Sequence, residues 1–93
     1  MLTLNLPAYQ YHLQKGEDGQ LLIWDILRRQ YVVLTPEEWV RQHFVNYLLE
    51  HLGVPRTLLR LEATIQYGSL TKWADILAYD RRGNPLLLVE CKA

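Results

Sequence analysis

The sequence has one cysteine, no excess of either charge and no long hydrophobic run. Ten acidic and ten basic residues give a formal net charge of zero, whereas a strong autonomous nucleic-acid binder usually carries a basic excess. The lone Cys91 excludes an intramolecular disulfide and fits a reducing cytoplasm. No stretch approaches the roughly 18 apolar residues of a membrane span, and the N-terminus lacks a signal-peptide pattern. We therefore expect a cytoplasmic protein that does not enter a membrane.

The composition is that of a small globular domain. The chain has 93 residues, of which 49% are hydrophobic and 22% charged, so it can bury one modest core and is not a disordered polar segment. No internal repeat, low-complexity run or linker divides it. Residues 1–93 are therefore expected to form one domain, with residues 1–34 as an N-terminal β extension and residues 35–93 as the start of its core.

The first third of the chain predicts a β-hairpin followed by another short strand. A glycine-bearing polar turn at residues 15–19 separates two alternating segments. The expected strands cover residues 2–14, 20–25 and 30–34. Arg28 and Arg29 fall between the last two strands, where arginines usually belong to a solvated turn. A phosphate-contacting role for these two arginines is the alternative.

The strongest local signal is a helix start at residue 35. Thr35 can serve as the N-cap, Pro36 suits the first helical position, and Glu38 stands where a capping box closes. Apolar residues then recur at helical spacing until Gly53 ends the pattern. We predict a helix over residues 36–52.

Residues 57–67 alternate between apolar and polar side chains and predict a half-buried strand that turns at residues 68–69. Glu62 lies on the polar side of this strand. That side is either the face of a functional site or plain solvent-exposed surface, and the alternation alone leaves both open.

The last part of the chain predicts an apolar β-hairpin that contains charged residues. If the turn lies symmetrically over residues 81–84, Asp75 stands directly opposite Glu90. Trp73 then faces Lys92. A turn shifted by one residue would place Asp75 opposite Lys92 instead. In either register the two acids and the lysine share one face, because residues two apart on a strand point the same way.

Such a cluster predicts either a metal site or an ion-pair network. Two close carboxylates repel each other unless one is protonated or a cation lies between them. Mg²⁺ prefers hard oxygen ligands, and a neighbouring lysine can orient a water or stabilise charge on a phosphate. In the alternative, Lys92 simply neutralises Asp75 and Glu90.

The order of Asp75, a gap, and then Glu90-x-Lys92 on a hairpin resembles the active-site motif of the PD-(D/E)XK nuclease superfamily. Three stretches sharpen the resemblance: residues 35–44, 73–76 and 88–93. Together they look like the stand-alone bacterial proteins related to the N-terminal nuclease domain of type I restriction enzyme R subunits. The resemblance runs from Leu4 to Ala93.

The resemblance implies a fold, a metal and a set of roles. The fold is an α+β restriction-endonuclease-like core. Asp75 and Glu90 would hold Mg²⁺ (Mn²⁺ would substitute), together with the backbone carbonyl of Cys91. Lys92 would assist the attacking water, and either Glu38 or Glu62 is a further acid that could join the site. The implied substrate is DNA, and restriction-system subunits are implied partners.

The same resemblance predicts that the chain stops short. The superfamily core usually runs helix, three strands, helix, strand, and residue 93 follows the third core strand. We therefore expect an uncovered sheet face that favours homo-oligomers, and a fragment that is inactive by itself. The alternative function is a catalytically inactive nuclease-fold module that binds nucleic acid or protein.

Overall fold

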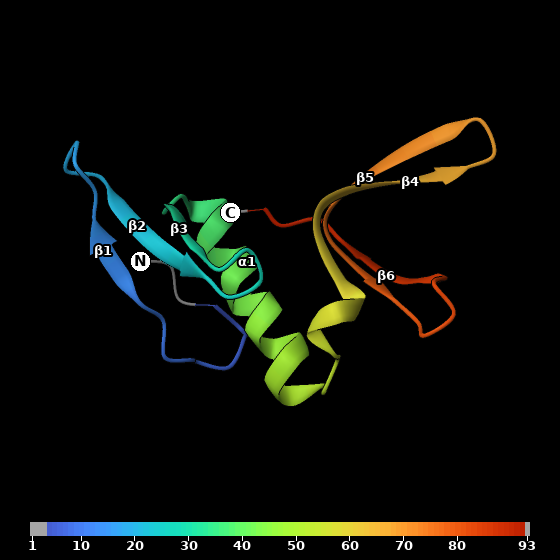
Figure 1. Ribbon diagram of the computed structural model, residues 1–93, viewed down its shortest axis with the longest axis horizontal. Helices are drawn as coiled ribbons and strands as arrows, with labels where there is room; N and C mark the ends of the chain where they lie inside the picture. Colours follow the sequence, from blue (N-terminus) through green and yellow to red (C-terminus); the bar gives the residue numbers. More distant parts are fainter. Residues whose placement is uncertain (1–3, 93) are drawn as a thin grey trace.

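The computed structural model describes residues 4–92 and has mixed α+β architecture. One α-helix, α1 (Pro36–Asn46), stands between two three-stranded antiparallel sheets. Figure 1 shows β1 to β3 at one end of the molecule, α1 in the middle and β4 to β6 at the other end. Within residues 4–92, no helix is long and apolar enough to cross a membrane.

The first sheet is the meander β1 (Leu13–Lys15), β2 (Leu21–Asp25) and β3 (Gln30–Val33). The second and third predicted strands are confirmed. The first was predicted too long, since residues 4–12 are irregular and residues 2–3 lie outside the described part.

Two causes account for this shortened first strand. Pro7 has no backbone N–H to give to a ladder. The tyrosines of this segment pack on the helix instead: the ring centroid of Tyr11 lies 4.9 Å from that of Trp39, and the ring of Tyr9 lies 4.9 Å from that of His43.

The helix begins where the sequence predicts and ends close to the predicted residue. A π-helical turn, η1 (Tyr47–His51), continues α1. Thr35 Oγ1 accepts a hydrogen bond from the Glu38 backbone N–H at 3.0 Å, so the N-cap is confirmed. The predicted capping box is only half formed, because the Glu38 carboxylate is bonded to neighbouring side chains, described below.

The second sheet follows a 3-10 turn, η2 (Arg56–Leu58), and contains β4 (Leu59–Tyr67), β5 (Leu70–Tyr79) and β6 (Pro85–Val89) in sequence order. Ile76 pairs with Val89 and Leu77 with Leu88. This is the predicted register in which Asp75 would meet Glu90. The ladder ends at Val89, however, and Glu90 no longer pairs.

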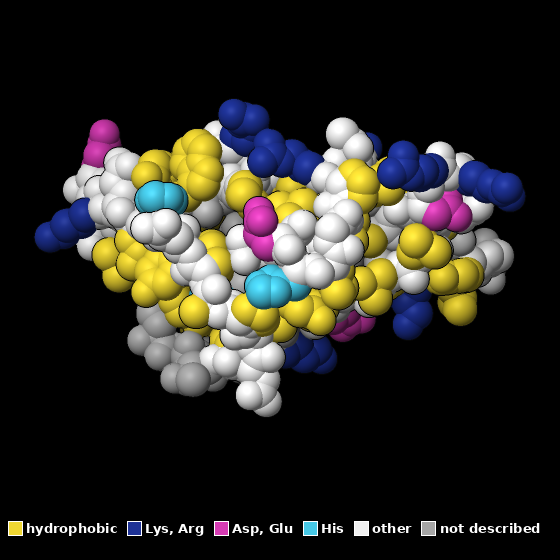
Figure 2. All heavy atoms as spheres, turned by 90° about the horizontal axis from the view of Figure 1, so that it is seen from below, with side chains coloured by type: hydrophobic (Ala, Val, Ile, Leu, Met, Phe, Trp, Pro, Cys, Tyr) yellow, Lys and Arg dark blue, Asp and Glu magenta, His cyan; other side chains and the backbone are white. Residues whose placement is uncertain are grey.

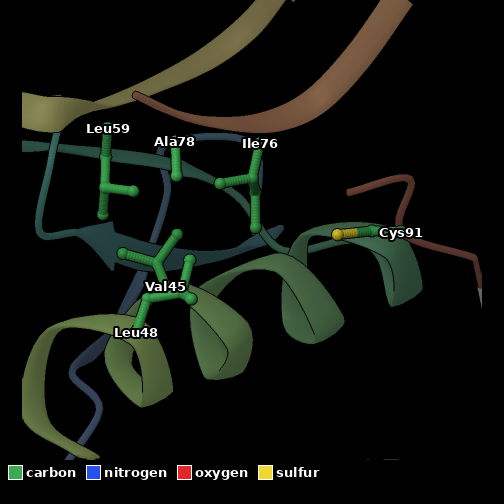
Figure 3. Close-up of a cluster of buried hydrophobic side chains, with 6 residues drawn as sticks. All are labelled: Val45, Leu48, Leu59, Ile76, Ala78 and Cys91. Atoms are coloured by element: carbon green, nitrogen blue, oxygen red, sulfur yellow. The ribbon is translucent and has the colours of Figure 1, made fainter. Parts of the chain in front are cut away.

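The core lies between α1 and this second sheet. Val45 and Leu48 point from the helical segment toward Leu59, Ile76 and Ala78, as Figure 3 shows. Cys91 lies beside the same cluster, over the N-terminal part of α1. Since all six cluster residues are at least nine-tenths buried, the contact fixes the end of β6 against the helix start.

Exposed apolar side chains lie beside the β4–β5 turn and, at the opposite end of β5, after the β5–β6 turn. They include Tyr67, Leu70, Trp73 and Leu86, which are 51–70% exposed. The expected uncovered sheet face stays a prediction. The expected homo-oligomer through it stays a prediction.

Candidate functional site

A cavity of about 180 Å³ opens where the N-terminus of α1 meets the second sheet. Four of its lining residues come from the helix start, and the others come from β4, β5 and the segment after β6. The lining residues are Thr35, Glu37, Glu38, Arg41, Glu62, Asp75 and Cys91. Four of the seven are acidic, which is an unusual concentration for a concave surface in a chain of zero net charge.

Asp75 is held firmly at this cavity. It is half-buried on β5, and its Oδ2 accepts a hydrogen bond from the Cys91 backbone N–H at 2.6 Å. Its Oδ1 accepts only a longer bond, 3.3 Å, from Trp73 Nε1. The contact to Cys91 joins β5 to the segment after β6, so it replaces the ladder pairing that ends at Val89. Oδ2 is thus fixed by a short hydrogen bond, whereas Oδ1 accepts only a long one.

Glu62 on β4 is the acid that lies across from Asp75. The register of β4 on β5 is set by flanking pairs, Leu61 with Ile76 and Ala63 with Ala74. Glu62 itself departs from the ladder with φ of 51°, a left-handed conformation that costs a residue with a Cβ roughly 1–2 kcal/mol. Such backbone strain concentrates at functional sites. The Glu62 side chain is 48% exposed, and its Oε1 accepts from Arg41 Nη2 at 3.2 Å.

Glu38 is the centre of a buried ion-pair network behind the cavity. Its carboxylate accepts from Arg41 Nη2 at 2.6 Å and Nε at 3.0 Å, from Gln42 Nε2 at 2.8 Å and from Arg28 Nη2 at 3.2 Å. Arg28 is anchored in turn by the fully buried Asp25. Arg28 is therefore not the solvated turn residue that the sequence predicted, whereas Arg29 is exposed as expected.

The network sets the charges of the site. Burial alone raises the pKa of Glu38, but the hydrogen bonds from Arg41 and Gln42 and the charges of Arg41 and Arg28 outweigh it and hold that pKa below its ordinary value. Glu38 is thus an ionised carboxylate at neutral pH, and the charges of Arg41 and Arg28 compensate its own. Burial, reinforced by the charge of Asp75, raises the pKa of Cys91 to about 11, so this thiol is protonated at neutral pH.

The predicted site residues separate into two groups. Asp75 and Cys91 line the cavity, whereas Glu90 and Lys92 are exposed and are not among its lining residues. Glu38 and Glu62, the two further acids considered from the sequence, both line it. Across residues 4–92, no three His, Cys, Asp or Glu side chains are grouped closely enough to form a metal cage.

Sequence reasoning missed Arg41, Gln42 and Asp25. A weak signal was available, since Glu38 and Arg41 stand three residues apart on a helix, and so do Asp25 and Arg28 along the turn after β2. What joins these two local pairs is the packing of that turn against α1, and no spacing in the sequence encodes it.

Comparison with known proteins identifies the family. The model of the family described as Type I restriction enzyme R protein N terminus (HSDR_N) matches residues 36–93, which is more than half of the chain. The chain belongs to this family. No curated protein and no solved structure matches it.

The family match coincides with the site. The matched region of this Type I restriction enzyme R protein N-terminal domain begins at the first residue of α1 and includes every cavity-lining residue except Thr35. The β1–β3 sheet lies outside it. Arg28 therefore comes from the segment that precedes the matched region. Its Nη2 lies 3.2 Å from Glu38 Oε1, and its Nη1 lies 3.8 Å from Glu62 Oε1.

Proposed function

We propose that this restriction-system domain hydrolyses phosphodiester bonds of DNA with a Mg²⁺ ion bound at Asp75. The observation that carries the proposal is the position of Asp75: it faces Glu62 across an acid-lined cavity at a helix N-terminus, in a chain of the restriction enzyme R protein family. The implied restriction-endonuclease-like core, extending over residues 35–93, is part of this proposal.

The donor set at the cavity fits Mg²⁺. This ion is usually bound through one or two carboxylates, with waters and substrate phosphate completing its shell. Asp75 offers Oδ1, which has only a 3.3 Å bond to displace, while Oδ2 keeps the side chain oriented through Cys91 N–H. Glu38 is unsuited to this role because two arginines and a glutamine already occupy its oxygens.

The second carboxylate ligand is either Glu62 or Glu90. Glu62 is favoured by its place in the cavity and its strained backbone. Glu90 is favoured by the Glu-x-Lys motif, which would also bring the Cys91 carbonyl to the metal. Glu90 is exposed, and Glu62 is exposed as well, although its Oε1 accepts a hydrogen bond from the buried Arg41.

The metal would polarise the phosphate and lower the pKa of a bound water. The protein's own groups would do the rest. Asp75 orients the site through its bond to Cys91 N–H. Lys92, exposed at the end of the chain segment that carries the motif, would orient the attacking water or stabilise charge on the phosphate.

Cleavage of supercoiled plasmid in Mg²⁺ tests the proposal, on this chain and on any longer protein that contains it. Asp75→Asn should abolish cleavage, because one fixed ligand is lost. The matched control is Asp18→Asn, which removes the same charge from an exposed turn far from the cavity. Lys92→Ala should also abolish cleavage without changing the circular dichroism spectrum.

The same assay separates the two possible second ligands. Glu62→Gln should abolish cleavage if Glu62 in the cavity is the second ligand. Glu90→Gln should abolish it if Glu90 of the Glu-x-Lys motif is that ligand. Full cleavage by folded Asp75→Asn would rule out the proposed centre.

A non-catalytic nuclease-fold module is the second candidate. The observation in its favour is the ion-pair network, in which Glu38 and Glu62 are already matched by Arg41 and Arg28 without any metal. This candidate predicts DNA or protein binding in EDTA and no Mg²⁺-dependent cleavage by any protein containing the domain. Cleavage that depends on Asp75 would exclude it.

A further inference from the structure

Three arginines near the start of β4 and the β5–β6 turn have no acidic partner among residues 4–92. Arg56, Arg60 and Arg81 are all exposed. In the part of the chain that the structure describes, the only basic residues in ion pairs are Arg28 and Arg41. Unlike the paired arginines of the network, these three therefore present their full charge to solvent.

These arginines line two adjoining surface hollows. One has a volume of about 300 Å³ and is bordered by Arg28, Arg56 and Arg60. The other, of about 410 Å³, is bordered by Arg60 and Arg81. Arg60 belongs to both hollows, and Glu62 belongs to the first hollow and to the cavity of the candidate site. The three concavities thus follow one another along the surface, beginning at Asp75.

The two hollows are lined by more arginines than acids: four arginines, and only Glu62 and Asp80 among the acids. Glu62 is matched by Arg41. Asp80, beside Arg81, accepts hydrogen bonds from the backbone N–H groups of Arg82 and Asn84, both at 2.8 Å, and these bonds leave its negative charge in place. The zero net charge of the chain therefore hides a local basic surface. Figure 2 shows Lys and Arg side chains in a row along one edge of the molecule, extending over the half that holds β4–β6.

Arg60 is positioned by the backbone. Its Nη1 donates to the carbonyl oxygens of Thr57 at 2.9 Å and Leu59 at 2.8 Å. These bonds hold one end of the planar guanidinium, while no bond to a described residue uses Nε or Nη2. A fixed guanidinium with free donors matches the oxygens of a phosphate better than a mobile side chain does.

We propose that Arg56, Arg60 and Arg81 form a track that binds the phosphate backbone of DNA and leads it to the cavity at Asp75. The inference rests on the proposed nuclease function for its direction, but the binding itself requires no metal. Contacts to phosphates position a nucleic acid without reading its sequence. The track should therefore bind duplexes of unrelated sequence equally well.

Fluorescence anisotropy with a labelled DNA duplex tests the track. The titrations are done in EDTA over a series of KCl concentrations, which removes any contribution from a metal or from cleavage. The triple variant Arg56→Gln, Arg60→Gln, Arg81→Gln should bind more weakly at every salt concentration. Its slope of log K against log [KCl] should also be shallower by about 0.9 per lost phosphate contact.

Two further variants make the result specific. Lys15→Gln, Arg29→Gln, Lys72→Gln removes the same charge from exposed positions that border neither hollow, and it should keep the wild-type affinity within about twofold and the slope within error. Replacing the three track arginines by lysine should restore most of the slope, since lysine is a point-charge phosphate ligand. Circular dichroism confirms that each variant is folded.

The outcomes distinguish the track from the nuclease proposal. If the glutamine triple loses affinity and slope in EDTA while the Lys15, Arg29 and Lys72 triple does not, the track stands even where no protein containing the domain cleaves DNA. If the glutamine triple binds like the wild type, or if the wild type does not bind duplex DNA in EDTA, the track is overturned. Tighter binding to an RNA duplex of the same length would overturn the assignment to DNA.

Discussion

Replacing Glu38 by alanine should destabilise the fold far more than its position in the first turn of a helix suggests. The Glu38 side chain is 7% exposed and accepts hydrogen bonds from Arg28, Arg41 and Gln42. Its removal leaves Arg41, which is 9% exposed, without its principal partner. Glu62 remains 3.2 Å from Arg41 Nη2, so part of the charge stays compensated.

The expected loss can be worked out from these contacts. Removing one member of a buried ion pair costs roughly 3–5 kcal/mol. The remaining Glu62 contact points to the lower end, so we expect about 3 kcal/mol. A chain of this size has roughly 5–14 kcal/mol of stability, so the variant should still fold. With a urea slope near 1.3 kcal/mol/M, the unfolding midpoint should fall by about 2 M.

The assay is urea unfolding at pH 7, followed by circular dichroism and tryptophan fluorescence. Glu37→Ala is the matched control: it removes an equal charge from the same helical turn, but Glu37 is exposed and makes no ion pair with a described residue. Its cost should be about 0.5 kcal/mol, from the helix dipole alone. If Glu38→Ala cost no more than Glu37→Ala, the account of a buried network centred on Glu38 would be refuted.

Three further predictions concern the cap, the pH dependence and the thiol. Thr35→Ala should lower the free energy of unfolding by about 1 kcal/mol in the same urea assay, and Thr35→Ser should lower it much less. Only the alanine variant lacks the oxygen that accepts the hydrogen bond from Glu38 N–H. Equal stabilities of the two variants would contradict the cap. The pKa of Glu38 lies lower in the folded than in the unfolded protein, so its contribution is present above its ordinary value of 4.5 and is lost as the pH falls through the folded pKa. The stability gap between the wild type and Glu38→Gln should therefore shrink on acidification, and a gap that is constant from pH 7 to pH 3 would argue against this linkage. Since Cys91 is buried with its pKa raised to about 11, it should react with a thiol reagent slowly in the native state and rapidly in urea; a native rate equal to that of a free thiol would show that the site is open.

The features that the sequence predicted well have local causes. The helix start follows from Thr35 and Pro36, whose effects act within one turn. The Ile76–Val89 pair has the predicted register, but the turn was placed wrongly: Tyr79 pairs with Pro85, and an irregularity between Ala78 and Tyr79 restores the predicted pairing further along. Asp75 was singled out by a local signal too, as a charged residue in an apolar strand; it lines the cavity, and its role as a site residue stays a prediction.

The features that were missed depend on contacts between distant segments. The alternation of residues 2–14 predicted a long strand, but Tyr9 and Tyr11 gain more by packing on α1. Glu62 was left undecided because its left-handed φ and its place across from Asp75 come from pairing with β5. Glu90 was expected beside Asp75 because the ladder was assumed to continue; instead, the Cys91 backbone N–H takes that place.

The most direct test of the central claim is calorimetric titration of the 93-residue chain with Mn²⁺ in the absence of DNA. It needs no catalysis, so it examines the metal centre alone. The account predicts saturable binding by the wild type and by Asp18→Asn, and loss of binding by folded Asp75→Asn. Undiminished binding by Asp75→Asn, or no binding by the folded wild type, would contradict a metal centre at Asp75 in this chain.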